Sequence, residues 1–288
     1  DVETAYGPAC YVEGTWHGVR VLFLTRHGAG HSVPPHLVNY RANIAALADA
    51  GVRDVFAINA VGSIDTSLAN GALVCLDDFL DFTKSRVLTF FDGSGPRGVV
   101  HVDVADAYHP ALRRELLDAA AAVGVQLRDG GVYACFEGPR FESPAEVRMA
   151  ALLGAHVAGM TGVPEMTLAV EAGLRYAAVS LVCNPCAGLS DVPITIEDVN
   201  AVLARLLADA CNSIAQGDAG RSADVHRERT VDDGDLLANM IQHACVHAVG
   251  QHRTFEHEHI RLRRVFGEDV AKVLEARAQA HHPFFAQG

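Results

Sequence analysis

Short apolar runs rich in β-branched residues alternate, over the first two thirds of the chain, with longer amphipathic stretches. The strand candidates are 19–25, 54–61, 72–82, 131–136 and 176–183. Residues 40–51 and 109–124 carry apolar positions at helical spacing, and each stretch stops at a glycine. Strands that alternate with helices predict an α/β fold, in which helices flank a central sheet.

Two further helix starts are marked by polar residues. The segment Ser143-Pro144-Ala145-Glu146 offers a Ser N-cap, a proline in the first turn and a glutamate three residues on. The segment 195–198 (TIED) opens another helix, expected to run to about residue 215. Both starts follow short polar loops, where residues that bind ligands tend to lie.

Composition changes after this helix. Residues 216–235 are polar, contain glycine and carry mixed charge, which is typical of a linker or an exposed excursion. We therefore expect one domain over 1–220 and a mainly helical, His-rich extension over 221–288. His243 and His247 share a helix face at a spacing that a metal could use, but histidines gathered by composition are the commoner explanation, and no metal site is assigned.

The net charge and the cysteine content indicate which partners and which cellular compartment to expect. The formal net charge of the 288 residues is −12, which argues against a general nucleic-acid or membrane surface. No apolar run approaches the roughly 18 residues of a membrane span, and the first residues show no signal-peptide pattern. The seven cysteines are odd in number and sit mostly in apolar stretches, as in reduced cytoplasmic proteins.

Candidate anion-binding groups follow two strands. In TRHGAGH, Arg26 and His27 come directly after a strand, where open α/β sheets bind ligands, and a guanidinium beside an imidazole suits a phosphate. The ordinary alternative is an arginine paired with a carboxylate and a histidine that closes a loop. In NAVGS, Asn59 supplies an amide and Ala60 lets the backbone approach a ligand, although a simple strand-to-loop turn has the same composition.

Two other loops could recognise a flat heterocycle and a sugar. In FEGPRFESPAE, Phe141 offers an aromatic face and Glu142 a carboxylate, unless that carboxylate only complements the dipole of the following helix. In GMTGVPE, Thr161 could give a hydroxyl to an anion and the backbone of Met160 could face a sugar. Core filling is the commoner role of such a methionine.

The segment SLVCNPCAG contains a C-x-x-C pair, Cys183 and Cys186. A zinc site would need two further ligands at suitable spacing, and no second such pair exists in the sequence. A thioredoxin-like pair should open a helix, whereas Pro185 and Gly188 continue here as a loop. We therefore expect two small buried residues rather than a metal or redox centre.

Taken together, these segments resemble the trimeric purine nucleoside phosphorylase and methylthioadenosine phosphorylase family. The matching pieces run in order from about residue 5 to residue 215: LFLTRHGAGHSVPPHLVNYRANIAAL, NAVGSI, YACFEGPRFES, GMTGVPEMTLAVEAG and SLVCNPCAG. Within that family the chain is most similar to S-methyl-5′-thioinosine phosphorylases. The resemblance implies a mixed, partly barrel-like sheet, a homotrimer, and reversible phosphorolysis of a purine nucleoside with inorganic phosphate and no metal or organic cofactor.

Roles carry over to this chain by matching position. The phosphate-binding positions are Arg26, His27, Asn59, Ala60 and Thr161. The nucleoside-binding positions are Phe141, Met160, Ile196 and His101. The positions that act on the departing base are Glu142, which matches the carboxylate that accepts from purine N1–H, and Asn184, which matches the residue at N7 and O6.

These matches favour particular substrates. A glutamate and an asparagine at the base favour a 6-oxopurine, because the amide can donate to O6 where 6-aminopurine enzymes commonly place an Asp. His101 matches a histidine that methylthio-specific members contribute from a neighbouring subunit, and Ile196 falls where those enzymes place an apolar residue. The expected substrate is therefore S-methyl-5′-thioinosine, with inosine or guanosine as the alternative.

Two departures from the family pattern leave other interpretations open. Family members begin with a strand and a Gly-rich loop that binds phosphate, whereas the first residues of this chain match the segment after it. Residues 221–288 match nothing in the family. A nucleoside-binding or nucleoside-hydrolysing protein that lacks the phosphate loop therefore remains an alternative to an active phosphorylase.

Overall fold

The computed structural model describes residues 1–16, 19–28, 32–122, 124–191, 194–195 and 199. The Val199 N–H donates to the Thr195 carbonyl at 3.3 Å, and the rest of the helix expected to begin at Thr195 lies outside these residues. Ile196 and the extension 221–288 also lie outside them. Among the described helices, none has the length and apolar character that a membrane crossing requires.

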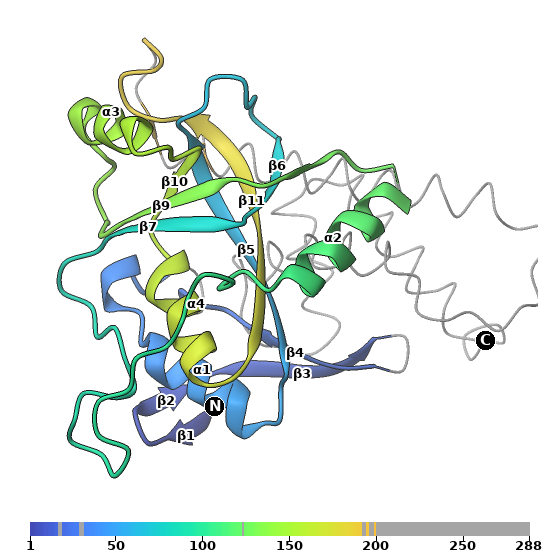
Figure 1. The fold of residues 1–288 in the computed structure, drawn as a ribbon, viewed down its shortest axis with the longest axis vertical. Helices are drawn as coiled ribbons and strands as arrows, with labels where there is room; N and C mark the ends of the chain where they lie inside the picture. The colour runs from blue at the N-terminus through green and yellow to red at the C-terminus, as the bar shows by residue number, and fades with distance from the viewer. Residues whose placement is uncertain (17–18, 29–31, 123, 192–193, 196–198, 200–288) are drawn as a thin grey trace, which may run out of the picture.

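A mixed seven-stranded sheet forms the centre of the molecule (Figure 1). Its strands are β5 (Asp54–Ser63), β6 (Leu73–Cys75), β7 (Asp78–Phe82), β8 (Leu127–Asp129), β9 (Val132–Phe136), β10 (Val157–Gly159) and β11 (Arg175–Pro185). The order across the sheet is β7-β9-β10-β5-β11-β6-β8. β5 and β11 pair in parallel along most of their length, while β10 runs antiparallel to β5 and β6 antiparallel to β11. The mixed sheet expected from the resemblance is confirmed.

The expected single strand over 72–82 is wrong, and its division curves the sheet. Residues 76–77 separate β6 from β7, yet these two strands stand five positions apart in the sheet order. Five strand spacings of a flat sheet would span roughly 24 Å, whereas the three residue steps from Cys75 to Asp78 reach at most about 11 Å. The sheet must therefore curl until its two ends approach, and the two-residue link from β8 to β9 requires the same curvature.

In the part of the chain that the structure describes, four helices cover the two faces of this sheet: α1 (Tyr40–Asp49), α2 (Pro110–Ala122), α3 (Pro144–Leu152) and α4 (Gly162–Glu171). Successive side chains of β11 point to opposite faces of the sheet. Tyr176 and Ala178 pack into the cluster that contains α1 and α4, whereas Ala177 and Val179 pack against α2. The predicted capping box is confirmed, since Ser143 Oγ accepts from the Glu146 N–H at 3.3 Å and Glu146 accepts from the Ser143 N–H at 2.7 Å.

The first 24 residues form two antiparallel pairs, of which the sequence pattern predicted only the last strand. β1 (Val2–Thr4) pairs with β2 (Gly7–Ala9), and β3 (Tyr11–Trp16) pairs with β4 (Val19–Leu24). The three strands that were missed are short or contain glycine, so they lack the apolar alternation that marks a strand. Arg26 and His27 follow β4 directly, as predicted.

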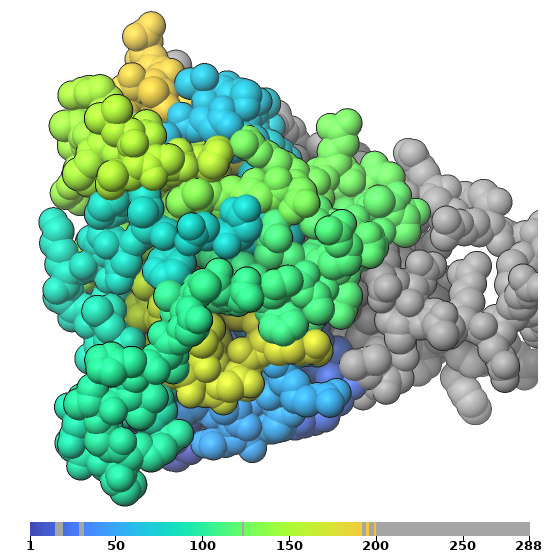
Figure 2. Space-filling model, viewed as in Figure 1, coloured from blue at the N-terminus to red at the C-terminus, as the bar shows by residue number. Residues whose placement is uncertain are grey.

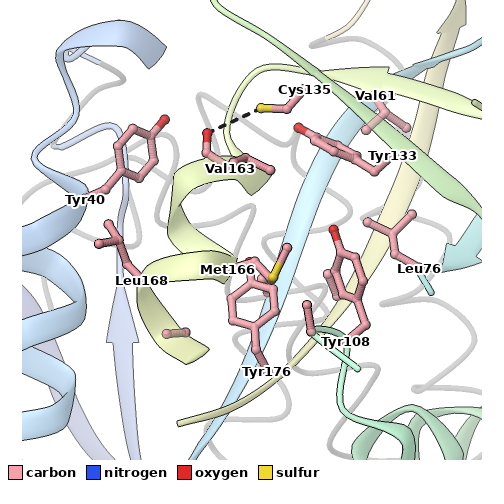
Figure 3. Close-up of a cluster of buried hydrophobic side chains, with 14 of the residues drawn as sticks. Tyr40, Val61, Leu76, Tyr108, Tyr133, Cys135, Val163, Met166, Leu168 and Tyr176 are labelled. Carbon is pink, nitrogen blue, oxygen red and sulfur yellow. Dashed lines mark hydrogen bonds between the residues drawn. The ribbon is translucent and has the colours of Figure 1, made fainter. Parts of the chain in front are cut away.

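The largest core cluster fixes the start of α4 (Figure 3). Tyr133 of β9 is fully buried, and its hydroxyl accepts hydrogen bonds from the backbone N–H groups of Thr161 (3.1 Å) and Gly162 (3.2 Å). A side chain at Gly162 would place its Cβ 2.9 Å from the Tyr133 ring, so close approach requires glycine there. Val163, at the first turn of the same helix, accepts from Cys135 Sγ at 3.4 Å.

Candidate active site

Arg26 is held by a carboxylate that the sequence pattern did not single out. Its Nε and Nη2 donate to the two oxygens of Glu165, both at 2.6 Å, and Tyr176 also donates to Glu165 at 2.8 Å. Burial by itself lowers the pKa of Arg26, but the facing carboxylate outweighs burial and raises it, so the guanidinium stays charged. Two of its five N–H groups are engaged by Glu165, and the planar fork is fixed in one orientation.

His27 closes the loop that follows β4. Its Nδ1 lies 2.8 Å from the carbonyl oxygen of Val33, whose own N–H donates to the His27 carbonyl at 2.9 Å. Gly28 adopts a positive φ of 68°, which lets the chain turn immediately after the histidine. The structural alternatives considered for Arg26 and His27, a carboxylate partner and a closed loop, are therefore present. These contacts also fix the orientation of both side chains at the end of a strand.

Thr161 and Asn59 meet where α4 begins. Thr161 is the N-cap of α4, but its hydroxyl makes no capping bond and lies 3.2 Å from Asn59 Oδ1. Asn59 is 2% exposed, so its amide is placed to act on Thr161 rather than to reach a ligand directly. Ala60, the next residue of β5, is exposed, and its small side chain leaves the neighbouring backbone accessible.

Glu142 is a buried carboxylate in the loop between β9 and α3. It is 7% exposed, and within the described part of the chain no other residue donates a hydrogen bond to its side chain. Burial raises its pKa above the ordinary glutamate value. Phe141, beside it, is 36% exposed and presents its ring at the surface of the loop. The backbone N–H of Glu142 itself is a hydrogen-bond partner that acts against the rise in its pKa, and the carboxylate has further lone pairs with which to accept from a ligand.

Asn184 lies at the end of β11, where the strand changes register against β5. Val182 pairs with Val61 and Asn184 with Gly62, so Cys183 is the extra residue of a bulge. Such bulges re-aim the side chain that follows them. Asn184 Nδ2 donates to the carbonyl oxygen of Pro185 at 2.8 Å, which fixes the plane of the amide.

Several close approaches bring these loops together. A Cβ at Gly62 would lie 2.7 Å from Cys186 Sγ and 3.3 Å from Asn184 Nδ2. The charge of Glu142 contributes to the raised pKa of the Cys186 thiol, about 12, of which burial is the main cause. A Cβ at Gly138 would lie 2.7 Å from Met160 Sδ. The glycines therefore allow the base-side residues and the end of β10 to share one region.

The two cysteines of the C-x-x-C pair are buried in different core clusters, as expected. Cys183 is packed with Leu181, and Cys186 with residues of α3 and β10. The raised pKa of Cys186 disfavours the thiolate that a metal or a redox reaction would need. Cys183 and Cys186 thus surround Asn184 as small apolar side chains.

His101 stands apart from the other candidate residues. It lies in the long segment between β7 and α2, which projects as a green lobe beside β1 and β2 (Figures 1 and 2). The imidazole is exposed, and a contact between the rings of Tyr6 and Phe90, whose centroids are 5.0 Å apart, ties the lobe to the N-terminal strands. Among the described residues of this single chain, no hydrogen bond or ion pair joins His101 to the loops around Glu142.

Arg86 is a second functional group that sequence reasoning missed. Its side chain is 1% exposed. It donates to the carbonyl oxygens of Val163 (2.6 Å), Phe136 (3.2 Å) and Glu137 (2.8 Å). It therefore fastens the loop that carries Glu142 to the turn at the start of α4. The only local signal was a basic residue after an apolar strand, which is too common to identify such a role.

The curled mixed sheet, with an oriented arginine and a buried carboxylate in loops that follow its strands, agrees with the phosphorylase fold expected from the sequence. The chain belongs to the Phosphorylase superfamily, which it matches over residues 2–216.

Relatives at high identity carry two kinds of name. A protein of Moorella thermoacetica named probable 6-oxopurine nucleoside phosphorylase is 50% identical over 202 residues, which cover 70% of this chain and 77% of that protein. A probable S-methyl-5′-thioinosine phosphorylase of Methanothermobacter thermautotrophicus is 49% identical over 187 residues, which cover 65% of this chain and 64% of that protein.

Solved structures share the fold. A methylthioadenosine phosphorylase from an antarctic soil metagenomic library superposes with a TM-score of 0.68 at 34% identity, covering 81% of each chain. A methylthioadenosine phosphorylase from Schistosoma mansoni in complex with tubercidin gives 0.68 at 28% identity, covering 85% of this chain and 91% of that chain.

Proposed function

We propose that this protein cleaves the glycosidic bond of a 6-oxopurine nucleoside with inorganic phosphate, releasing the free purine and a pentose 1-phosphate. The observation that carries the proposal is Glu142, a carboxylate that is 7% exposed and receives no side-chain hydrogen bond from another described residue. The N1–H of a 6-oxopurine is a donor that suits the remaining lone pairs of this carboxylate. The names of the relatives at 50% and 49% identity support the same reaction class.

The residues that bind phosphate and the residues that bind the base act in the same step. Glycosidic cleavage passes through an oxocarbenium-like state, in which C1′ becomes positive and the purine negative. Phosphate, held by Arg26 and His27 with the Thr161 hydroxyl, stabilises the cation and then captures C1′. Asn184 donates to O6 or N7 and so stabilises negative charge on the departing base, while Glu142 accepts from N1–H and holds the purine in orientation.

The same pair sets the base preference. A 6-aminopurine carries no hydrogen on N1 and has a donor at position 6, so it would face Glu142 with an acceptor and Asn184 Nδ2 with a donor. Such a base would lose the contacts that a 6-oxopurine makes with both groups in a buried site, which discriminates against it. We expect hypoxanthine or guanine as the released base and a much slower reaction with adenine nucleosides.

At the sugar, we propose a 5′-methylthio group, with the 5′-hydroxyl of inosine as the second candidate. The exposed position of His101 supports a role in the site of a neighbouring subunit, as the resemblance implies for a homotrimer. A parallel measurement of kcat/KM for inosine and S-methyl-5′-thioinosine decides between the two. A trimer is tested by light scattering of the purified protein, and a monomer with full activity would contradict it.

We further propose that residues 1–220 form the catalytic domain, that no metal or organic cofactor takes part, and that the enzyme works in the cytoplasm. Among the described residues, Cys10, Cys75, Cys135 and Cys186 form no disulfide, which supports a reducing compartment. Loss of turnover in EDTA, restored by a metal, would contradict the second proposal. Loss of turnover when residues 221–288 are deleted, with the remaining chain still folded, would contradict the first.

The experiment that tests the reaction is omission of phosphate. The protein should release hypoxanthine from inosine or S-methyl-5′-thioinosine only when phosphate is present. Release at an equal rate without phosphate would identify a nucleoside hydrolase. Tight binding of hypoxanthine without turnover in excess phosphate would instead identify a nucleoside-binding protein.

A further inference from the structure

A link of two residues, Met160 and Thr161, joins the end of β10 to the start of α4. The proposed function places the backbone of Met160 at the ribose and the hydroxyl of Thr161 at the phosphate. Val163, just beyond the link, has an extended backbone (φ −122°, ψ 133°), so the regular helix begins only after it. The Thr161 hydroxyl donates to Asn59 Oδ1 at 3.2 Å, which is longer than an ordinary O–H···O bond and holds the link only weakly.

Tyr133 of β9 contacts the backbone at both ends of this link. Its hydroxyl points towards the start of α4 and accepts from the N–H groups of Thr161 (3.1 Å) and Gly162 (3.2 Å) (Figure 3). Its ring leaves no room for a side chain on either flank, since a Cβ at Gly159 would lie 2.8 Å from Tyr133 Cζ and one at Gly162 2.9 Å from Cε1. Tyr133 is fully buried in the largest core cluster, whose packing fixes the ring.

We infer that Tyr133 is a positioning residue, which holds Met160 and Thr161 where they meet the ribose and the phosphate. The inference rests on the proposed function, because it requires both substrates at the link. Phosphate must lie within attacking distance of C1′ before the glycosidic bond breaks, and a misplacement of about 1 Å can cost about 100-fold in rate. Because Tyr133 is fully buried, it acts on the reaction only through the link.

Replacing Tyr133 by Phe tests this role, because Phe keeps the ring and removes only the hydroxyl. The N–H groups of Thr161 and Gly162 then lose their buried acceptor, and we expect the link to shift. The kcat/KM for phosphate should fall by about 10- to 100-fold, and the melting temperature by roughly 3–10 °C. Burial raises the pKa of the Tyr133 hydroxyl, so the substitution removes no charge at the pH of the assay.

Tyr108 supplies the matched control in the same core cluster. It is 2% exposed, but its hydroxyl has no hydrogen bond among the described residues. Its ring lies against that of Tyr176, with the centroids 6.1 Å apart, and Phe keeps this contact. Tyr108→Phe should therefore leave the kcat/KM for phosphate within about twofold of wild type and should not lower the melting temperature.

Two readouts separate positioning of the link from general loosening of the protein. The dissociation constant of hypoxanthine, measured by calorimetry, should stay within about twofold of wild type in Tyr133→Phe, because Glu142 and Asn184 lie in other loops. Tyr133→Phe and Thr161→Val should each raise the KM for phosphate. Their effects should not multiply in the double variant, because Tyr133 acts on phosphate through Thr161.

Several results would overturn the inference. An unchanged kcat/KM for phosphate in Tyr133→Phe would do so, even if the melting temperature fell. A KM for phosphate below that of the wild type would mean that the released N–H groups bind phosphate themselves. Hypoxanthine binding weakened as much as phosphate use, or effects that multiply in the double variant, would indicate general loosening.

The test also covers a variant that fails to fold and a proposed function that fails. If Tyr133→Phe does not fold, judged by its thermal melt, Gly162→Ala takes its place, because its Cβ would push the Tyr133 ring away from the link. The same loss of phosphate use with unchanged hypoxanthine binding is then required. A wild type without phosphate-dependent hypoxanthine release refutes the proposed function, whereas a phosphate-dependent wild type that Tyr133→Phe equals refutes only the role of Tyr133.

Discussion

Replacing Glu142 by Gln should make the protein more stable and less active. The carboxylate is 7% exposed and has no donor from another described residue, and burial raises its pKa. In the free protein it is therefore a charge held in an unfavourable place. Gln keeps the shape of the side chain and removes its charge. The purine N1–H needs an acceptor, and one of the two terminal atoms of Gln is a nitrogen that donates instead.

The two magnitudes follow from different interactions. Removing an uncompensated functional charge should raise the free energy of unfolding by about 0.5–2 kcal/mol, a melting-temperature increase of roughly 1–8 °C for a domain of this size. Losing a charge-assisted hydrogen bond in the transition state costs about 1.5–3 kcal/mol, which lowers kcat/KM for S-methyl-5′-thioinosine by about 10- to 150-fold.

Glu146, four residues along, is the matched control and should give the opposite pattern. Its side chain accepts from Arg140 and from the Ser143 N–H, and these contacts lower its pKa to about 2. Glu146→Gln keeps an acceptor for the Ser143 N–H but loses the ion pair with Arg140, so it should lower the free energy of unfolding by about 0.2–1 kcal/mol, while base preference stays unchanged.

The pH dependences of the two glutamates also differ in sign. Glu142 has a raised pKa in the folded protein, so wild-type stability relative to Glu142→Gln should improve as pH falls through that value, while activity is lost there. Glu146 has a lowered pKa, so its contribution is present above the unfolded value near 4.5 and disappears as pH falls towards about 2. Thermal melts between pH 2 and 9 and initial rates between pH 4 and 9 measure both, and a destabilised Glu142→Gln with normal kcat/KM would refute the assignment.

Three further predictions concern neighbouring groups. Asn184→Asp should shift kcat/KM towards adenine nucleosides, measured as the ratio for adenosine over inosine, and an unchanged ratio would exclude Asn184 from base recognition. Replacing Cys183 and Cys186 together by Ala should cost about 1 kcal/mol each in denaturant melts and leave that ratio intact, whereas a large shift would give the cysteines a direct role. Glu165→Gln should lower the free energy of unfolding by about 3–5 kcal/mol, because a buried Arg26 loses its counter-charge, and should raise the KM for phosphate. Normal stability of this variant would contradict the pairing.

The fold was predictable where local pattern and tertiary role agree. The cap at Ser143 and the apolar strands 54–61 and 176–183 appear in the structure as the capping box, β5 and β11. The strand 72–82 failed, because continuous apolar character cannot show that its halves pair with β11 and β9. The two halves pair at different places in the sheet, and this separation depends on the curvature of the whole sheet.

The residues of the candidate site also divide into those that the sequence indicates and those that it does not. Arg26 became a candidate because it stands out after an apolar strand, whereas the roles predicted for Glu142 and Asn184 came from matching the segments of the family. Glu165 and Arg86 could not be identified, because their functions depend on partners 139 and 77 residues away in sequence. A residue that orients another functional group carries no local pattern of its own.

The central claim is most directly tested by product stoichiometry with S-methyl-5′-thioinosine and phosphate. We predict one 5-methylthioribose 1-phosphate for each hypoxanthine released, no release when phosphate is omitted, and a higher kcat/KM than for inosine. Free 5-methylthioribose in place of the sugar phosphate, formed at the same rate without phosphate, would contradict phosphorolysis.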